Sequence, residues 1–214
     1  MRRIAVLASG AGTNLQALLD AIASRTLDAE VVVVVSSRAD AGALRQAGCA
    51  GIAAVSLPLA DRHDPAARHA YDLQLADVLL AFKPDLLVLA GWMLILTPAF
   101  LNRFPGRIVN VHPALLPDDG GIEVLTSRGL LPALRGARVV RDALAQRLPV
   151  SGATVHYVTT AVDAGPVILR HEVPVLPDDN EMTLHERIKT VEHQLLPRAV
   201  AIALAAIAIK TKEG

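Results

Sequence analysis

Short apolar runs alternate with segments of helical period through the first half of the chain. Residues 30–35 read EVVVVV, a continuous β-branched run that is typical of a parallel strand covered on both faces. In residues 13–23, by contrast, Leu15, Leu18 and Ile22 recur at helical spacing. The predicted strands are 3–8, 30–35, 52–57, 85–90 and 107–111, and the predicted helices are 13–23, 40–47 and 64–82. This alternation predicts right-handed crossovers and an α/β fold with a doubly wound, mostly parallel sheet.

The last third of the chain has a different pattern. Strand-like segments at 153–159 and 167–175 are separated by a short turn that contains Gly165 and Pro166, which favours antiparallel pairing. A long helix is predicted from Glu181 onward, with a bend near Pro197. Because no low-complexity linker divides the chain, we expect a single domain over residues 1–214, with an antiparallel C-terminal portion and a long C-terminal helix.

Composition and charge exclude several classes of protein. The 214 residues are 52% hydrophobic but only 3% aromatic, so the chain is not disordered and its core must be mainly aliphatic. A net charge of +0 argues against a protein that works mainly by binding nucleic acid backbones. The single cysteine, Cys49, excludes an intrachain disulfide framework and a cysteine-based metal site. The apolar runs, including 199–209, are too short for a signal peptide or a membrane span, which indicates a cytoplasmic protein.

A glycine-rich loop, SGAGTN at residues 9–14, joins the first predicted strand to the first predicted helix. Glycines let backbone amides approach a ligand closely and a helix N-terminus favours an anion, so a phosphate group is the natural guest. Leu15 stands where a dinucleotide fingerprint has its third glycine, and no Lys-Ser or Lys-Thr pair follows. The loop is therefore neither a dinucleotide fingerprint nor a P-loop, and the alternative is a tight turn without a ligand.

Asn110 and His112 lie at the end of the fifth predicted strand, which Pro113 terminates. Residues two apart on a strand project from the same face, and ligands of open α/β sheets bind at the carboxyl edge. An amide donor beside an imidazole suits stabilisation of an oxyanion together with control of a proton. Asp163, in the sequence DAGP, could orient or protonate this imidazole, and the alternative is a simple turn between strands.

The other histidines carry weaker signals. His156 alternates along a predicted strand, so we expect it to be structural or to support Asp163 indirectly. The rest show no paired spacing of metal ligands, and no serine has the context of a nucleophile elbow. We therefore expect neither a metal site nor covalent catalysis.

Seven longer stretches carry a family resemblance when they are taken together and in order. They are ASGAGTNLQAL at 8–18, SSRADAGAL at 36–44, RHAYD at 68–72, PDLLVLAGWMLIL at 84–96, NVHPALLP at 110–117, GATVHYVTTAVDAGPVI at 152–168 and ERIKTVEHQLLP at 186–197. The chain resembles, over about residues 3–197, the phosphoribosylglycinamide formyltransferases (glycinamide ribonucleotide transformylases), a folate-dependent family of purine biosynthesis. The resemblance implies a Rossmann-like formyltransferase fold and transfer of the formyl group of 10-formyltetrahydrofolate to the amine of glycinamide ribonucleotide.

The resemblance also implies roles for individual residues. Asn110, His112 and Asp163 match the family's catalytic triplet. Residues 1–103 would hold the ribonucleotide phosphate, and residues 104–214 would carry catalysis and folate binding. Matching residues for the ribonucleotide are Gly12, Thr13, Asn14 and Glu192, of which the last contacts the glycinamide, and those for the folate are Arg68, Met93, Leu94, Ile95 and Leu96. The implied partners are these small molecules, without metal, nucleic acid or membrane, and a homodimer is left open.

Three departures from the family pattern stand near the expected site. Many relatives carry Arg where Leu94 stands and His where Arg138 stands. Residues 118–131, DDGGIEVLTSRGLL, interrupt the loop after the catalytic strand and show no sustained helical or strand period. We expect a surface excursion beside the folate cleft that is mobile and passive; alternatively, its apolar residues Ile122, Val124 and Leu125 fold back as a partial lid over the pterin site.

The expected chemistry is direct attack of the glycinamide amine on the formyl carbon. Asn110 and a protonated His112 would stabilise charge on the formyl oxygen, and Asp163 would favour the charged imidazole and help to move a proton to the departing folate nitrogen. Three alternatives remain: a formyltetrahydrofolate hydrolase, a methionyl-tRNA formyltransferase, and a non-catalytic nucleotide-binding relative with a remodelled loop. The methionyl-tRNA formyltransferase reading is the weaker one, because it needs a basic tRNA-binding extension and this chain shows neither the extra length nor a net positive charge.

Overall fold

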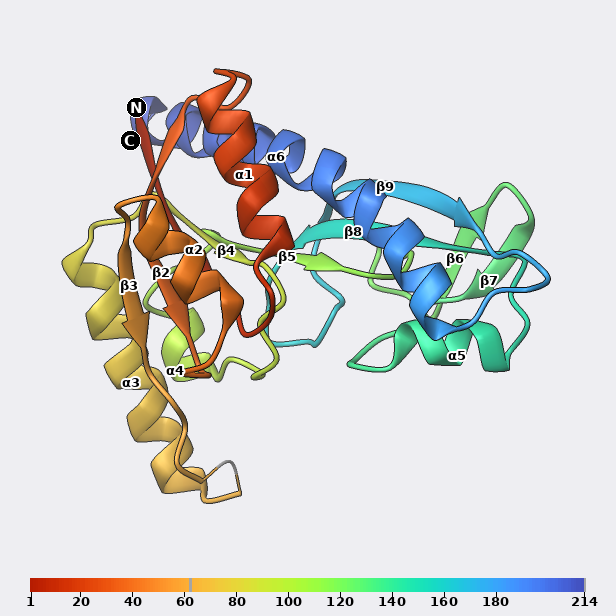
Figure 1. The fold of residues 1–214 in the computed structure, drawn as a ribbon, viewed down its shortest axis with the longest axis horizontal. Coiled ribbons are helices and arrows are strands. Elements are labelled where there is room, and N and C mark those ends of the chain that lie inside the picture. Colours follow the sequence, from red (N-terminus) through yellow and green to blue (C-terminus); the bar gives the residue numbers. More distant parts are fainter. Residues whose placement is uncertain (62, 214) are drawn as a thin grey trace.

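The computed structural model describes residues 1–61 and 63–213, and it contains a doubly wound α/β sheet (Figure 1). The strands are β1 (Arg2–Leu7), β2 (Ala29–Ser36), β3 (Ala53–Ser56), β4 (Leu86–Leu89), β5 (Ile108–His112), β6 (Glu123–Thr126), β7 (Gly129–Pro132), β8 (Val150–Tyr157) and β9 (Val167–Pro174). The helices are α1 (Thr13–Ala23), α2 (Gly42–Cys49), α3 (Pro65–Ala81), α4 (Pro98–Leu101), α5 (Val139–Ala145) and α6 (Glu181–Glu213).

One seven-stranded sheet runs through both halves of the chain, in the order β3-β2-β1-β4-β5-β8-β9. The strands from β3 to β5 are parallel, whereas β8 pairs with β5 and β9 pairs with β8 in antiparallel register. The chain winds outward from β1 to β3 and then returns to place β4 on the other side of β1. The carboxyl ends of β1 and β4 therefore form the switch point at which open α/β sheets bind ligands.

Two apolar cores cover the two faces of the sheet. On one face, Leu15 and Leu18 of α1 pack with Leu184, Ile188 and other residues of α6. On the opposite face, Leu75 and Leu79 of α3, Phe100 of α4 and Phe104 after α4 pack over β1 and β4. The expected aliphatic core and both helical layers of the doubly wound fold are therefore confirmed.

The predicted strands and helices of the first half are confirmed, and their ends differ from the prediction by a few residues at most. Asp64 caps α3, because its carboxylate accepts a hydrogen bond from the amide of Ala66 at 2.9 Å, and Pro65 occupies the first turn. α4 was not expected, because four residues are too few to show a helical period. α6 continues through Pro197, where a bend was predicted.

Residues 118–131, for which the sequence showed no strand period, contribute an antiparallel hairpin, β6–β7, and the expected passivity of the segment stays a prediction. Val124 pairs with Leu131 and packs against Leu115 and Val150, so one face of the hairpin is buried. Leu125 lies on the opposite face and is exposed, so both faces of the hairpin carry apolar residues. The sequence therefore does not show the alternation of apolar and polar residues that would identify a strand. Figure 1 shows the hairpin at the end of the molecule remote from β3.

The partial lid is contradicted by this arrangement. Val124 is only 2% exposed because it lies on the inner face of the hairpin, against Leu115 and Val150. The tip of the hairpin is fixed by Ser127, whose amide and hydroxyl donate to the carboxylate of Glu172 on β9. Residues 123–132 are therefore a separate two-stranded sheet that is attached to β9 by these contacts.

Among the described residues, one helix segment, Glu181–Ile209 of α6, has the length and the apolar composition of a membrane-spanning helix. The same property is found in core helices of soluble proteins, and α6 packs along α1, β8 and β9. These contacts account for part of its apolar length, since 39% of the most apolar window is buried.

Gly152 provides a test of the packing between β8, β9 and the loop after β5. A Cβ atom at this position would lie 2.3 Å from the carbonyl oxygen of His171 and 2.5 Å from Cδ2 of Leu115. We expect Gly152→Ala to lower the free energy of unfolding by about 1–3 kcal/mol, measured by urea denaturation. Gly48→Ala is the matched control, because Gly48 lies in α2 with no atom near its added Cβ, and it should stabilise by about 0.5–1 kcal/mol. Equal effects of the two substitutions would contradict this packing.

Candidate active site

The loops that follow β1, β4 and β5 meet at the carboxyl edge of the sheet. The amide of Ser9, after β1, donates to the carbonyl oxygen of Gly91, after β4, at 3.0 Å across the switch point. β5 pairs beside β4 and ends in His112, so its terminal side chains face the same edge. The sheet topology therefore brings the glycine-rich loop and the Asn110–His112 strand end to one side of the molecule.

Asn110 and His112 are held in place by the pairing of β5 with β8. Asn110 lies opposite His156, and His112 lies opposite Thr154. His112 is only 3% exposed and Asn110 is half-buried, so both side chains are largely shielded from water. Asn110 and His112 therefore lie at one strand end as expected, and the neighbouring strand β8 adds a third polar side chain, His156.

Hydrogen bonds to backbone carbonyls define which ring nitrogen of each histidine carries a proton. Nε2 of His112 lies 2.9 Å from the carbonyl oxygen of Leu134, and Nδ1 of His156 lies 2.9 Å from that of Tyr157. Because a carbonyl oxygen only accepts, these nitrogens donate, and in the neutral rings the opposite nitrogens are unprotonated. Nε2 of His156 can then accept from Nδ2 of Asn110 at 3.2 Å, which leaves the second amide hydrogen of Asn110 for a ligand.

The carboxylate of Asp163 lies between the two histidines. Its oxygens are 3.6 Å from Nδ1 of His112 and 3.7 Å from Nε2 of His156, which are distances longer than hydrogen bonds. The amide of Gly136 donates to the same carboxylate at 2.9 Å, and Arg135 donates to the backbone carbonyl of Asp163, also at 2.9 Å. The structure therefore brings together Asn110, His112 and Asp163, as the sequence predicted.

Burial and charge act in opposite directions on the cluster. Burial lowers the pKa of His112 and outweighs the effect of Asp163, which raises it. Burial tends to raise the pKa of Asp163, but His156, the charge of His112 and the amide of Gly136 hold that pKa below its usual range. In the unliganded site near pH 7, the lowered pKa of His112 favours a neutral imidazole beside a carboxylate, and the protonated His112 expected during the reaction stays a prediction. Nδ1 is the nitrogen that can accept a proton, and Asp163 faces it.

The glycine-rich loop leads directly into α1. Gly12 is the N-cap of α1 at φ 92°, and a Cβ at this position would lie 2.9 Å from Cα of Ala43. A side chain at Gly12 would thus disturb the packing of α1 on α2, whereas Gly10 has open space around it. Gly10, exposed and next to the switch point, is the residue through which a ligand could approach the backbone.

Asn14 and Glu192 are joined although 178 residues separate them. Nδ2 of Asn14, in the first turn of α1, donates to Oε2 of Glu192, on α6, at 2.8 Å. Both side chains are buried, and burial raises the pKa of Glu192 against the opposing hydrogen bond from Asn14. Oδ1 of Asn14 is buried without a hydrogen-bond partner among the described residues. The pair therefore offers an unused acceptor and a carboxyl group to a polar ligand.

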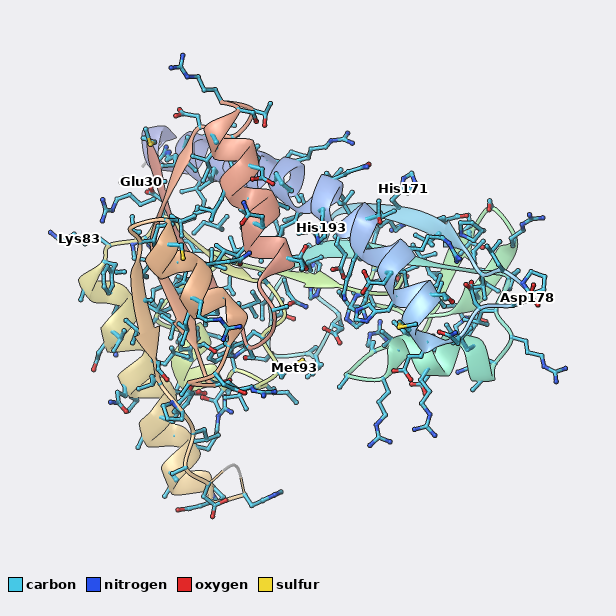
Figure 2. The ribbon with its side chains drawn as sticks, viewed as in Figure 1. Glu30, Lys83, Met93, His171, Asp178 and His193 are labelled. Carbon is cyan, nitrogen blue, oxygen red and sulfur yellow. The ribbon has the colours of Figure 1, made fainter. Side chains whose placement is uncertain are left out.

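The expected folate residues form a second group, on the loop after β4 and on α3. Arg68 donates to Asp72 at 2.8 Å and to the carbonyl oxygen of Ile95, while Asp72 accepts from the amide of Thr97. Leu96 is buried and Leu94 is partly buried, whereas Ile95 is exposed, as is Met93, which Figure 2 labels on the loop after β4. Nε of Arg68 is buried without a partner among the described residues. Arg68 thus fixes a loop that presents apolar side chains.

The sequence did not indicate two residues of the site. Arg135 and Gly136 contact Asp163 from a segment 27 residues or more away, and neither belongs to a recognisable motif. Arg138 begins α5 without a side-chain capping bond and is exposed. In the described part of the chain, no three His, Cys, Asp or Glu side chains are grouped so that they could hold a metal ion.

This fold and this cluster define an α/β enzyme whose site can polarise a carbonyl oxygen and move one proton. Comparison with known families gives the particular class, because the formyl transferase family model matches residues 2–200. The chain belongs to the formyl transferase family.

Named relatives and solved structures agree with this membership. The phosphoribosylglycinamide formyltransferase of Mycobacterium tuberculosis (strain H37Rv) is 44% identical over 199 residues, which are 93% of this chain and 83% of that protein. The crystal structure of glycinamide ribonucleotide transformylase 1 from Symbiobacterium toebii superposes with a TM-score of 0.83 at 39% identity and covers 96% of this chain and 89% of that one. The trifunctional purine biosynthetic protein adenosine-3 of Drosophila melanogaster is 38% identical over 99% of this chain, which spans only 14% of that protein.

The raised pKa of Glu192 predicts a pH-dependent effect on stability. A carboxyl group whose pKa is raised on folding contributes stability at low pH and loses it as the pH rises through the folded value. Glu192→Gln keeps an acceptor for Asn14 but removes the buried charge. The free energy of unfolding of this variant should therefore increase relative to that of the wild type as the pH rises above the ordinary pKa of a glutamate, as measured by urea denaturation.

Glu186→Gln is the matched control for this prediction, because Glu186 is an exposed residue of the same helix whose pKa is lowered by Lys189. It should not gain stability over the same range. A Glu192→Gln protein that loses stability relative to the wild type as the pH rises would contradict the assigned burial of the carboxyl group.

Proposed function

We propose that this protein transfers the formyl group of 10-formyltetrahydrofolate to the amine of glycinamide ribonucleotide, a reaction of purine biosynthesis. The observation that carries the proposal is the buried Asn110–His112–Asp163 cluster in a chain of the formyl transferase family that is 44% identical to a phosphoribosylglycinamide formyltransferase. The family makes the protein a formyl-transferring enzyme, and its partners are small molecules. A cytoplasmic location and a homodimer stay predictions.

The residues of the cluster have complementary tasks. The free amide hydrogen of Asn110 is directed to the oxygen on which negative charge develops, because the other amide hydrogen is engaged by His156. Nδ1 of His112 accepts the proton that the attacking amine loses, and the resulting imidazolium lies against the carboxylate of Asp163. The same proton then passes to the departing nitrogen, so His112 ends neutral and the transfer needs no other proton source.

The formyl donor supplies the one-carbon group and leaves as an amine. Its proposed site is the loop after β4, where exposed Met93 and Ile95 offer an apolar surface. Nε of Arg68, which has no partner in the described part of the chain, offers a donor there. These features fit a ring system that has both apolar faces and hydrogen-bond acceptors. Leu94 and Leu96 complete the apolar side of the loop.

The ribonucleotide is proposed to occupy the switch point. Its phosphate binds the backbone of the Gly10–Gly12 turn and Thr13 at the N-terminus of α1, where free amides and the helix dipole favour an anion. Asn14 follows Thr13 in the same turn and contacts Glu192 on α6, and the buried acceptors of this pair suit the polar glycinamide portion. This arrangement would direct the substrate amine toward His112.

The proposal predicts turnover that depends on the amine substrate. Purified protein should convert 10-formyltetrahydrofolate, followed by absorbance, only when glycinamide ribonucleotide is present. Conversion without the ribonucleotide would favour a formyltetrahydrofolate hydrolase, and no conversion in either case would favour a non-catalytic relative.

Variants of the cluster extend this experiment. Asn110→Ala, His112→Ala and Asp163→Ala should each lower kcat by at least about 10²-fold without loss of the fold, and their combinations should lower it little further because the three act as a unit. His171→Ala is the control, because this histidine is exposed on β9 and should retain turnover within about twofold. Near-normal turnover of His112→Ala would refute the mechanism.

A further inference from the structure

Arg135 connects the active-site carboxylate to the segment that departs from the family pattern. Its guanidinium donates to three backbone carbonyls: that of Asp163 at 2.9 Å and those of Gly120 and Gly121 at 3.0 and 2.5 Å. Gly120 and Gly121 belong to the stem of the hairpin, residues 118–122, which precedes β6. The planar fork of Arg135 therefore bridges the stem and the Asp163 loop by hydrogen bonds.

The residue that Arg135 holds is backbone-strained. Asp163 has φ 49°, a left-handed conformation that is uncommon for a residue other than glycine. Arg135 fixes its carbonyl, while the amide of the next residue, Gly136, fixes its carboxylate. Two adjacent residues of one segment thus hold both the backbone and the side chain of Asp163.

The stem also packs directly against the Asp163 loop. A Cβ atom on Gly120, which has φ 68°, would lie 2.8 Å from the carbonyl oxygen of Ala164. This close approach leaves no room for another side chain between the stem and the loop. The stem is therefore a wall of the active site, although the tip of the hairpin is attached to β9.

We propose that Arg135 is a positioning residue for the carboxylate of Asp163, and that the stem at residues 118–122 has become part of the frame of the active site through it. Arg135 does not touch the reacting atoms; it determines where Asp163 lies relative to His112. This inference rests on the proposed function for its effect on turnover, but its structural claim can be measured without turnover.

Arg170 is a matched control for the loss of stem contacts. Its guanidinium donates to the carbonyl of Leu116 at 3.2 Å and to the carboxylate of Asp118 at 2.8 Å. It therefore holds the same loop as Arg135 but has no bond to Asp163. Arg135→Met and Arg170→Met each remove one guanidinium from this loop, and only the first releases the catalytic carboxylate.

The kinetic test compares these variants with the wild type. Arg135→Met should lower kcat by about tenfold to 10²-fold, the scale of a small misplacement of a catalytic group, while the KM for glycinamide ribonucleotide stays within about threefold. Arg170→Met should keep kcat within about twofold. Arg135→Lys retains the charge near His112 but cannot bridge both loops, so its kcat should lie closer to that of Arg135→Met than to that of the wild type.

A second measurement reports the position of the carboxylate directly. The amide of Gly136 donates to Asp163, so its hydrogen exchange, measured by NMR, should accelerate in Arg135→Met toward the rate in Asp163→Ala. Arg170→Met should keep the wild-type exchange rate. Hydrogen exchange separates the positioning role of Arg135 from the proposed function. An inactive wild type would refute the proposed function, whereas the exchange rate of Gly136 would still test whether Arg135 positions Asp163.

Three results would overturn the inference. One is unchanged Gly136 exchange in Arg135→Met. Another is an equal loss of kcat in Arg135→Met and Arg170→Met, which would assign Arg135 only to the stability of the stem. The third is full recovery of kcat in Arg135→Lys, because charge alone would then account for the effect.

Discussion

The antiparallel register of β8 against β5 is the constraint on which the site depends. It places His156 opposite Asn110 and Thr154 opposite His112. The parallel part of the sheet supplies only the first strand of the site, and the chain must reverse direction in β8 to bring His156 and then Asp163 back to it. A shift of this register by one residue would turn His156 to the other face of the sheet and leave the amide of Asn110 without its partner.

This register places several polar groups within an apolar sheet. Backbone carbonyls of Leu134 and Tyr157 accept from the two imidazoles, and the amide of Gly136 donates to Asp163. The first two bonds satisfy buried imidazoles, and each of the three fixes the proton or the direction of the group that it contacts. Burial lowers the pKa of His112, which favours a neutral ring with Nδ1 as a base, and the nearby carboxylate would stabilise the charged ring of the proposed transfer.

Much of this fold could be predicted from the sequence, because each signal was local. EVVVVV at 30–35 and the helical period of 13–23 depend on neighbouring residues, and so does the Asn110–His112 pair at the end of one strand. Arg135 could not be predicted, because its contacts with Asp163 and Gly120 follow from the path of an unfamiliar loop. The hairpin was missed for a related reason, since its two apolar faces hide the strand period.

The family resemblance gave roles that spacing alone left open. Glu192 carries no motif of its own, and its bond to Asn14 depends on the packing of α6 against α1. His112 shows what a motif leaves open: the sequence placed the residue at the strand end, but its charge depends on how far burial outweighs the neighbouring carboxylate. Electrostatic properties of this kind require the three-dimensional surroundings of the group.

The central claim is that burial holds His112 as a neutral imidazole whose Nδ1 is free to accept a proton. The direct measurement is ¹⁵N NMR of the histidine rings in the unliganded protein, with His112 assigned by comparison with His112→Ala. The account predicts a neutral ring at about pH 7 with the hydrogen on Nε2, because Nε2 donates to Leu134 and the pKa lies below its ordinary value. An imidazolium at this pH, or a neutral ring with its hydrogen on Nδ1, would contradict the account.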